Sequence, residues 1–368
     1  MMRKVLLGDV IKINPTTKVT KNQIVKFVSM DKLDPFTKVP NGYEKRKFSS
    51  GAKFTNGDTL LARITPCLEN GKTAFVDFLD DLEVAAGSTE FVILRNIEGL
   101  TDPAYIYYLS ISPAFRDYAI KSMVGTSGRQ RVQNDVLAKM ELSLPPLDQQ
   151  KKIANILSSL DEKIELNRHM NETLEQLGQA LFRHYFIDKA RQSNGNVETV
   201  PLGKKFHPKR GRSLQARDMI CGNTPVISGG LKPAGFHNEA NTTTPVITIS
   251  ASGANAGFVS VWGEPVWSAD SSYIDSTITK YVYTYYLFLK NKQKEIYDMQ
   301  TGSGQPHIYP KHIELLKIVD LSDLELDNFE QRVRQLFEMI HENKKQIDYL
   351  SNIRDALLPK LISGEIEV

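Results

Sequence analysis

"LPPLDQQKKIANILSSLDEKIELN", from Leu144 to Asn167, decides the fold of this chain. Two prolines open the stretch, and a run of good helix formers follows in which apolar residues recur every three or four positions. This spacing places the apolar side chains on one face of an α-helix, which we expect to cover residues 149 to 186. At roughly 1.5 Å per residue, such a helix is about 57 Å long.

A second helix with the same pattern closes the chain, over residues 324 to 368. In both helices the apolar positions alternate in steps of three and four over about four heptads, which is typical of a coiled-coil seam. Because each helix needs a partner, we expect the two to pair as an antiparallel coiled coil. The predicted seam residues are Ile153, Leu157, Leu160, Ile164, Asn167, Leu174 and Leu181 in the first helix, and Phe329, Val333, Leu336, Ile340, Asn343, Ile347, Leu350 and Leu357 in the second.

Asn167 and Asn343 place a polar side chain near the middle of each seam. In a fully overlapped antiparallel pair the two would meet, and such a pair sets the register of the helices at some cost in stability. The alternative is that each asparagine is solvated at a loosely packed turn.

The second half of the chain repeats the first at an offset of 176 residues, without a gap from Ser127 to Leu181. Upstream of each helix, β-branched segments alternate with turns that contain Gly, Pro or Asn. The sequence therefore predicts an α+β fold with two β-rich globular domains, related by a pseudo-two-fold axis and separated by the two long helices. The predicted boundaries are 1–146, 147–192, 193–323 and 324–368, with a polar linker at residues 191–199.

Composition narrows the class of protein. The chain has 368 residues, of which 41% are apolar, enough for more than one domain. Cys67 and Cys221 show no C-x-x-C spacing, and no apolar stretch has membrane-spanning length, so we expect a cytoplasmic protein in a reducing compartment.

The two β-rich regions carry a small excess of positive charge. Residues 1–146 carry 20 Lys and Arg against 16 Asp and Glu, and residues 193–323 carry 13 against 11. This modest positive bias is compatible with contact to a phosphate backbone.

Catalytic and metal-binding patterns are not apparent in the sequence. "ENGKT" at 69–73 resembles the end of a phosphate-binding loop, but Pro66 stands where the first glycine belongs and has no N–H to offer. The seven histidines have no metal-ligand spacing, and Asp80, Asp81 and Glu83 are interpreted as a solvated turn. We therefore predict a chain that is not an enzyme and holds no metal or cofactor of its own.

Candidate side chains for nucleic-acid contact lie in the two β-rich regions. Arg, Gln and Asn can form bidentate contacts with base edges, whereas Lys mainly neutralises phosphate. For any single residue, ordinary surface charge at a turn is an equally good explanation. The candidates are Arg63, Asn70, Lys72, Arg129, Gln130 and Arg131 in the first region, and Lys204, Lys205, Lys209, Arg210, Arg212, Arg217, Ser252, Asn255, Gln305 and His307 in the second.

Three stretches resemble the DNA-specificity subunits of type I restriction-modification systems. "LPPLDQQKKIANILSSLDEKIELN" is similar to the Pro-Leu-x-Glu-Gln-x-x-Ile opening of a helical region in that family, "ALFRHYFID" (180–188) to its close, and "RDALLPKLISGEI" (354–366) to the usual C-terminal ending. Gln149 stands where glutamate is usual, and the second opening, "DLELDNFEQRV", lacks the proline pair.

The resemblance implies two target-recognition domains, each reading one half of a bipartite, asymmetric site in double-stranded DNA. It implies that the helices act as a spacer and as a docking surface for two modification (methyltransferase) subunits, which carry S-adenosylmethionine, while restriction subunits use ATP. Phe182, Tyr185, Phe186 and Phe337 are possible docking residues, although packing onto the neighbouring domain explains them equally well. Two other classes remain: a non-catalytic coiled-coil scaffold that binds proteins, and an enzyme with an unrecognised site.

Overall fold

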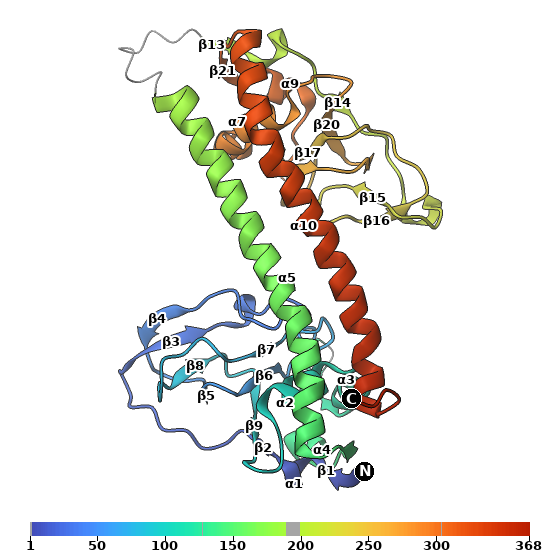
Figure 1. The fold of residues 1–368 in the computed structure, drawn as a ribbon. Coiled ribbons are helices and arrows are strands. Elements are labelled where there is room, and N and C mark those ends of the chain that lie inside the picture. The colour runs from blue at the N-terminus through green and yellow to red at the C-terminus, as the bar shows by residue number, and fades with distance from the viewer. Residues whose placement is uncertain (1, 127, 189–198, 303) are drawn as a thin grey trace. The chain divides into compact units, whose positions relative to one another are not determined.

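The computed structural model describes residues 2–126, 128–188, 199–302 and 304–368, so most of the predicted linker and the serines at 127 and 303 lie outside the described residues. The chain divides into two compact units, Met1–Glu165 with Ile347–Val368 (unit 1) and Leu166–Gln346 (unit 2). Each unit combines one β-rich head with part of helix α5 (Leu147–Phe182) and part of helix α10 (Asp323–Ser363) (Figure 1). The predicted α+β class is confirmed.

Head 1, residues 2–146, contains two four-stranded sheets. One is antiparallel with the order β2-β9-β6-β7, and the other has the order β4-β3-β8-β5, in which β3 and β8 run parallel. A separate pair, β1 with β12, joins the two ends of the head. The elements are β1 (Arg3–Leu6), α1 (Leu7–Val10), β2 (Ile11–Ile13), β3 (Ile24–Val28), η1 (Met30–Lys32), β4 (Glu44–Lys47), β5 (Ala52–Phe54), β6 (Thr59–Ala62), β7 (Thr73–Phe75), β8 (Ala85–Gly87), β9 (Phe91–Asn96), α2 (Pro103–Ile111), α3 (Pro113–Lys121), β10 (Met123–Val124), β11 (Arg131–Val132), α4 (Asn134–Leu137) and β12 (Glu141–Leu144).

The central strand β6 and the first four residues of β9 are buried on both faces of the antiparallel sheet of head 1, which explains why they are almost entirely apolar. Successive side chains of a strand point to opposite faces. Leu60 therefore packs into the core shared with the second sheet, whereas Leu61 packs into the core that includes α2 and the start of α5. Ile93 and Leu94 on β9 divide in the same way.

Head 2, residues 199–322, is built in the same way. Its antiparallel sheet has the order β14-β20-β17-β18, and its second sheet has the order β16-β15-β19, in which β15 and β19 run parallel. The pair β13 with β21 closes this head. The elements are β13 (Thr199–Pro201), η3 (Leu202–Lys204), β14 (Lys209–Arg210), η4 (Ala216–Asp218), β15 (Thr224–Ile227), β16 (Gly235–His237), β17 (Val246–Ser250), β18 (Val259–Trp262), β19 (Trp267–Ser268), β20 (Ser271–Asp275), α7 (Val282–Asn291), α8 (Gln293–Asp298), α9 (Pro310–Glu314) and β21 (Lys317–Val319).

The two long helices begin in different ways. At the start of α5 the buried Gln150 side chain donates to the carbonyls of Leu100 and Pro145 and accepts from the Asp102 N–H. At the start of α10 the Ser322 and Glu325 side chains each bond the other's backbone N–H, at 3.4 and 2.9 Å, which is a capping box. The capping box marks the start of α10, whereas the proline pair Pro145-Pro146 marks the start of α5.

Within unit 1, α5 and α10 meet at a buried ion pair. The guanidinium of Arg354 lies 2.7 Å from the Asp161 carboxylate, and both side chains are at most 5% exposed. Tyr108 on α2 donates to the same carboxylate at 2.7 Å. Three helices are therefore held together by one aspartate.

Within unit 2, the two asparagines are in contact with the opposite helix but do not meet each other. Asn167 donates to Gln346 at 2.7 Å, and Asn343 donates to Asn171 at 2.9 Å. The prediction that Asn167 pairs with Asn343 is therefore wrong, because the pairing of the helices is shifted by one helical turn. Every predicted seam residue in α5 and α10 is nevertheless buried or half-buried.

Replacing Asn167 with leucine is expected to raise the free energy of unfolding by about 1 kcal/mol. Its Oδ1 atom is buried without a hydrogen bond among the described residues, while Gln346 is exposed and can bond water instead. Urea denaturation would measure the change, with Asn343→Leu as the matched control because Asn343 is only half-buried. A loss of stability in Asn167→Leu would contradict this prediction.

Candidate nucleic-acid interface

In head 1, main-chain hydrogen bonds gather three predicted residues where β6 ends. The Arg63 N–H donates to the Glu90 carbonyl at 2.9 Å, and the Arg63 carbonyl accepts from the Val132 N–H at 2.9 Å. The Gln130 carbonyl accepts from the Thr65 N–H at 3.0 Å, and Arg131 forms a β-bridge with Ile64. The segment after the Ser-Gly pair is thereby attached to the end of a sheet strand.

Two arginines lie at this strand end with different surroundings. The Arg131 guanidinium donates from Nε and Nη2 to the Glu90 carboxylate, with a closest distance of 2.6 Å, while its side chain remains 42% exposed. Arg63 donates to the Val132 carbonyl at 3.4 Å and borders an open, polar groove of about 390 Å³ that Lys53 and Asn14 also line. Hydrogen bonding from Arg131 lowers the pKa of Glu90, so this carboxylate stays ionised near neutral pH.

Asn70 and Lys72 are not part of this strand-end cluster. They lie on the β6–β7 turn, where the Asn70 N–H donates to the Pro66 carbonyl and the Lys72 ammonium donates to the Met30 carbonyl at 2.9 Å. Asn70 is exposed, whereas Lys72 is half-buried and has a structural role. In the "ENGKT" segment the N–H groups of Asn70, Gly71 and Lys72 donate to main-chain carbonyls of the same turn.

Head 2 has the same main-chain arrangement where β17 ends. The Ala251 N–H donates to the Asp270 carbonyl at 3.1 Å, and the Ala251 carbonyl accepts from the Ile308 N–H at 2.9 Å. Gly253 donates to the Pro306 carbonyl at 3.1 Å, and Ser252 forms a β-bridge with His307. These bonds match those of head 1 one by one, so the strand end is the same feature built twice.

Arg210, on the edge strand β14, supplies the guanidinium at the strand end of head 2. It donates to the Asp270 carboxylate at 2.5 Å, and its side chain is 41% exposed. The Ser252 hydroxyl donates to the other oxygen of the same carboxylate. The His307 ring stacks on Tyr309 with a centroid distance of 6.0 Å.

The predicted basic residues of head 2 are divided among several elements. Lys205 pairs with Asp320 at 2.6 Å, and Arg212 lies over the ring of Trp267. The charged side chains of Lys204, Lys209, Arg217 and Arg129 are exposed to solvent. The neutral side chain of Gln305 is also exposed, whereas Asn255 is half-buried. The cluster seen in the sequence is therefore a set of separate contacts around the head.

Glu90 and Asp270 are the residues that sequence reasoning missed. Each directly precedes a central strand, β9 or β20, and each holds an arginine of the predicted set. Their numbers differ by 180, so they do not coincide at the repeat offset of 176. Their shared position just before β9 or β20 is the signal that would have identified them. Upstream of Ser127 the two halves of the chain align only with gaps, so this shared position cannot be seen in the sequence.

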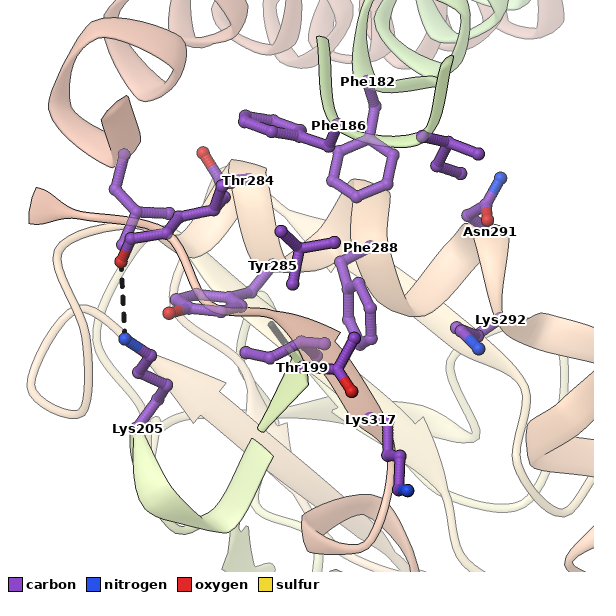
Figure 2. Close-up of a pocket in the computed structure, with 15 residues that line it drawn as sticks. Phe182, Phe186, Thr199, Lys205, Thr284, Tyr285, Phe288, Asn291, Lys292 and Lys317 are labelled. Carbon is purple, nitrogen blue, oxygen red and sulfur yellow. Dashed lines mark hydrogen bonds between the residues drawn. The ribbon is translucent and has the colours of Figure 1, made fainter. Parts of the chain in front are cut away.

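Most of the aromatic residues at the end of α5 and on α10 form a core. Phe182, Phe186 and Phe337 are 5%, 7% and 1% exposed, and Tyr185 packs against Phe329. Figure 2 shows Phe182 and Phe186 above Phe288 and Tyr285 in an apolar cavity of about 280 Å³, with Lys205 donating to the Leu321 carbonyl at its edge. Of the two explanations offered for these aromatic residues, the structure supports packing onto the neighbouring head.

Metal-ligating and membrane-spanning features were also sought in the described ranges. No group of three His, Cys, Asp or Glu residues there is arranged to hold a metal ion. Asp80 and Glu83 instead form ion pairs with Lys26, at 3.3 and 2.7 Å. In the same ranges, no helix combines the length and the apolar character needed to cross a membrane.

Comparison with known proteins gives a consistent result. Residues 2–176 match the family model for the type I restriction modification DNA specificity domain. The type I restriction enzyme HindI specificity subunit of Haemophilus influenzae is 26% identical over 84% of this chain and 86% of that protein. The MjaIX specificity subunit of Methanocaldococcus jannaschii is 27% identical over 72% of this chain and 69% of that protein.

The fold is shared with a solved protein. The crystal structure of a type I restriction-modification system S subunit from M. genitalium has a TM-score of 0.59 to this chain, at 20% identity. The alignment covers 98% of this chain and 96% of that one.

Proposed function

We propose that this chain is a DNA-specificity subunit of a type I restriction-modification system, as its similarity to that family supports, and that each head reads one half of a bipartite, asymmetric site in double-stranded DNA. The observation that carries the proposal is the strand end built twice. In head 1 the pair Arg131–Glu90 lies at the end of β6 with Arg63 and Gln130, and in head 2 the pair Arg210–Asp270 lies at the end of the equivalent strand β17 with Ser252 and His307. Side chains of these types supply the hydrogen bonds that distinguish base pairs in the major groove.

In this proposal, α5 and α10 form an antiparallel coiled coil that relates the heads by a pseudo-two-fold axis. Their contacts within each unit, Asp161 with Arg354 and Asn167 with Gln346, support such pairing. A rigid spacer of this kind fixes the distance between the heads, so they can read two half-sites at only one separation along the DNA. One turn of DNA, about 34 to 36 Å, is the scale with which the length of the helices is compared.

The chain itself is proposed to be non-catalytic and to hold no cofactor. Methylation is assigned to two modification subunits that carry S-adenosylmethionine, and cleavage to restriction subunits that use ATP. Since the aromatic residues at the end of α5 are largely buried, we place the docking surface for modification subunits on the exposed apolar side chains of the helices. They include Ile156 and Tyr349 in unit 1, and Leu166, Leu177 and Met339 in unit 2.

The salt dependence of DNA binding tests this function. For the full chain on duplex DNA, log K is expected to fall linearly with log salt, with a slope of about −0.9 per phosphate contacted. Exchanging exposed Lys204, Lys209 or Arg217 for glutamine should reduce the slope by about one unit wherever that residue neutralises a phosphate. Lys121→Gln, which removes an exposed lysine already paired with Asp117, is the control.

The competing function is a scaffold whose heads bind proteins. It predicts no salt-dependent affinity for duplex DNA and no sequence selected from a random duplex library. Methylation of DNA by the chain alone, with S-adenosylmethionine added, would instead favour an enzyme and contradict the proposed function.

A further inference from the structure

We propose that Glu90 and Asp270 are positioning residues for base recognition, each holding one arginine, Arg131 or Arg210, so that its outer N–H edge meets a guanine. This inference rests on the proposed function and deepens it. It assigns one guanine to each half-site and names the residue that orients each arginine.

The pairing has arisen twice from different residues, which is the first argument for it. The carboxylates occupy one topological place, since the carbonyls of Glu90 and Asp270 accept equivalent main-chain bonds. The arginines come from different elements, Arg131 from β11 and Arg210 from β14. The repeat partner of Arg131 is His307, so duplication alone does not explain the second pair. What the two heads share is a guanidinium held by a carboxylate at the strand end.

The geometry leaves the recognition edge of each arginine available. A guanidinium has five N–H donors in a planar fork. Arg131 donates to Glu90 through Nε and Nη2, and Arg210 donates to Asp270 through Nη2. In neither case does Nη1 form a hydrogen bond with another described residue, and the side chains are 42% and 41% exposed. The end of the fork, with Nη1 and the second hydrogen of Nη2, matches the O6 and N7 acceptors of guanine.

The charge of the carboxylates argues against a role in plain phosphate binding. An acidic side chain at a DNA-facing surface repels the phosphate backbone and weakens non-specific affinity. An arginine whose rotamers are already restricted, however, loses less conformational entropy when it binds a base. A carboxylate at this place therefore favours discrimination between bases at the expense of overall attraction. The Ser252 hydroxyl donates to the Asp270 carboxylate and so restricts its movement, which further restrains Arg210.

Selection of sequences from a random duplex library by the full chain tests the inference. The wild-type chain is expected to select a guanine at one position of each half-site. Glu90→Gln should lower the preference for guanine at one position of one half-site by about tenfold, and Asp270→Asn should do so only in the other half-site. Arg131→Ala should abolish the preference that Glu90→Gln weakens. Affinity for a duplex without the site should rise in Glu90→Gln, by about threefold, because a negative charge is removed.

Asp117→Asn is the matched control, since it removes an acidic partner from the exposed pair with Lys121. It should leave every base preference unchanged. A purely structural role for Glu90 predicts that Glu90→Gln lowers the melting temperature and weakens the base preference equally at all positions. Either of these two results would overturn the inference. If the wild type selects a bipartite sequence that Glu90→Gln and Arg131→Ala leave intact, this inference alone fails. If the wild type selects no sequence, the proposed function fails with it.

Discussion

Asp161→Ala is expected to lower the free energy of unfolding by about 4 kcal/mol, because it leaves the buried Arg354 guanidinium without its closest partner. Burial alone would lower the pKa of Arg354, but the Asp161 and Asp355 carboxylates outweigh it and raise the pKa. The arginine remains charged after the substitution, because a guanidinium is not deprotonated in proteins and Asp355 stays beside it at 2.8 Å. The Tyr108 hydroxyl also loses its 2.7 Å bond to the Asp161 carboxylate and keeps only the longer, 3.3 Å bond to the Ser158 hydroxyl.

Urea denaturation of the full chain measures this effect. Asp117→Ala is the control, because its pair with Lys121 is exposed and should contribute less than about 1 kcal/mol. The double variant Asp161→Leu with Arg354→Met should recover more than half of the loss, since both charges are then replaced by apolar groups. If Asp161→Ala costs no more than the control, the ion pair does not join the helices of unit 1 as described.

Lengthening both long helices by one heptad is expected to abolish tight binding to the original DNA target. The insertions belong between Glu165 and Leu166 in α5 and between Gln346 and Ile347 in α10, where one compact unit gives way to the other. Seven residues add about 10 Å of helix, which corresponds to about three base pairs. They also preserve the heptad pattern, with a rotation of only about 20°.

A sequence selection with the lengthened chain should return the same half-site bases separated by a spacer about three base pairs longer. The original site should then be bound about as weakly as non-specific DNA, a loss of about 1,000-fold or more. Inserting the heptad in α5 alone is the control, since it shifts the pairing of the helices and should lower stability. New half-site bases, or an unchanged spacer, would contradict the role of the helices as a ruler.

The helical part of the fold was predictable from the sequence because its signal is local. The three-four spacing from Ile153 to Leu181 is read within a single segment, and it predicted α5 and the burial of its seam. The predicted helix over 149–186 differs from α5 by a few residues, since π-helical turns cover Arg183–Asp188. The repeat offset also aligned Val132 with Ile308, and both residues donate the same main-chain bond, to the residue that follows β6 or β17.

Contacts between distant segments were less predictable. The register of the helix pair, which places Asn167 opposite Gln346, depends on side-chain packing along the whole interface. The burial of Phe337, stacked on Tyr283 of α7, depends on how the head folds against α10. Neither relation has a signature within its own segment of sequence.

The sequence by itself therefore determined the two long helices, the duplicated α+β organisation and the resemblance to the specificity subunits, because periodicity, repeats and motifs are properties of the linear chain. Only the tertiary structure decided that Glu90 and Asp270 hold Arg131 and Arg210, and that Asp161 meets Arg354. The physical reason is that a carboxylate and a guanidinium attract over a few ångströms in space, while strand order and helix register decide which distant residues come that close.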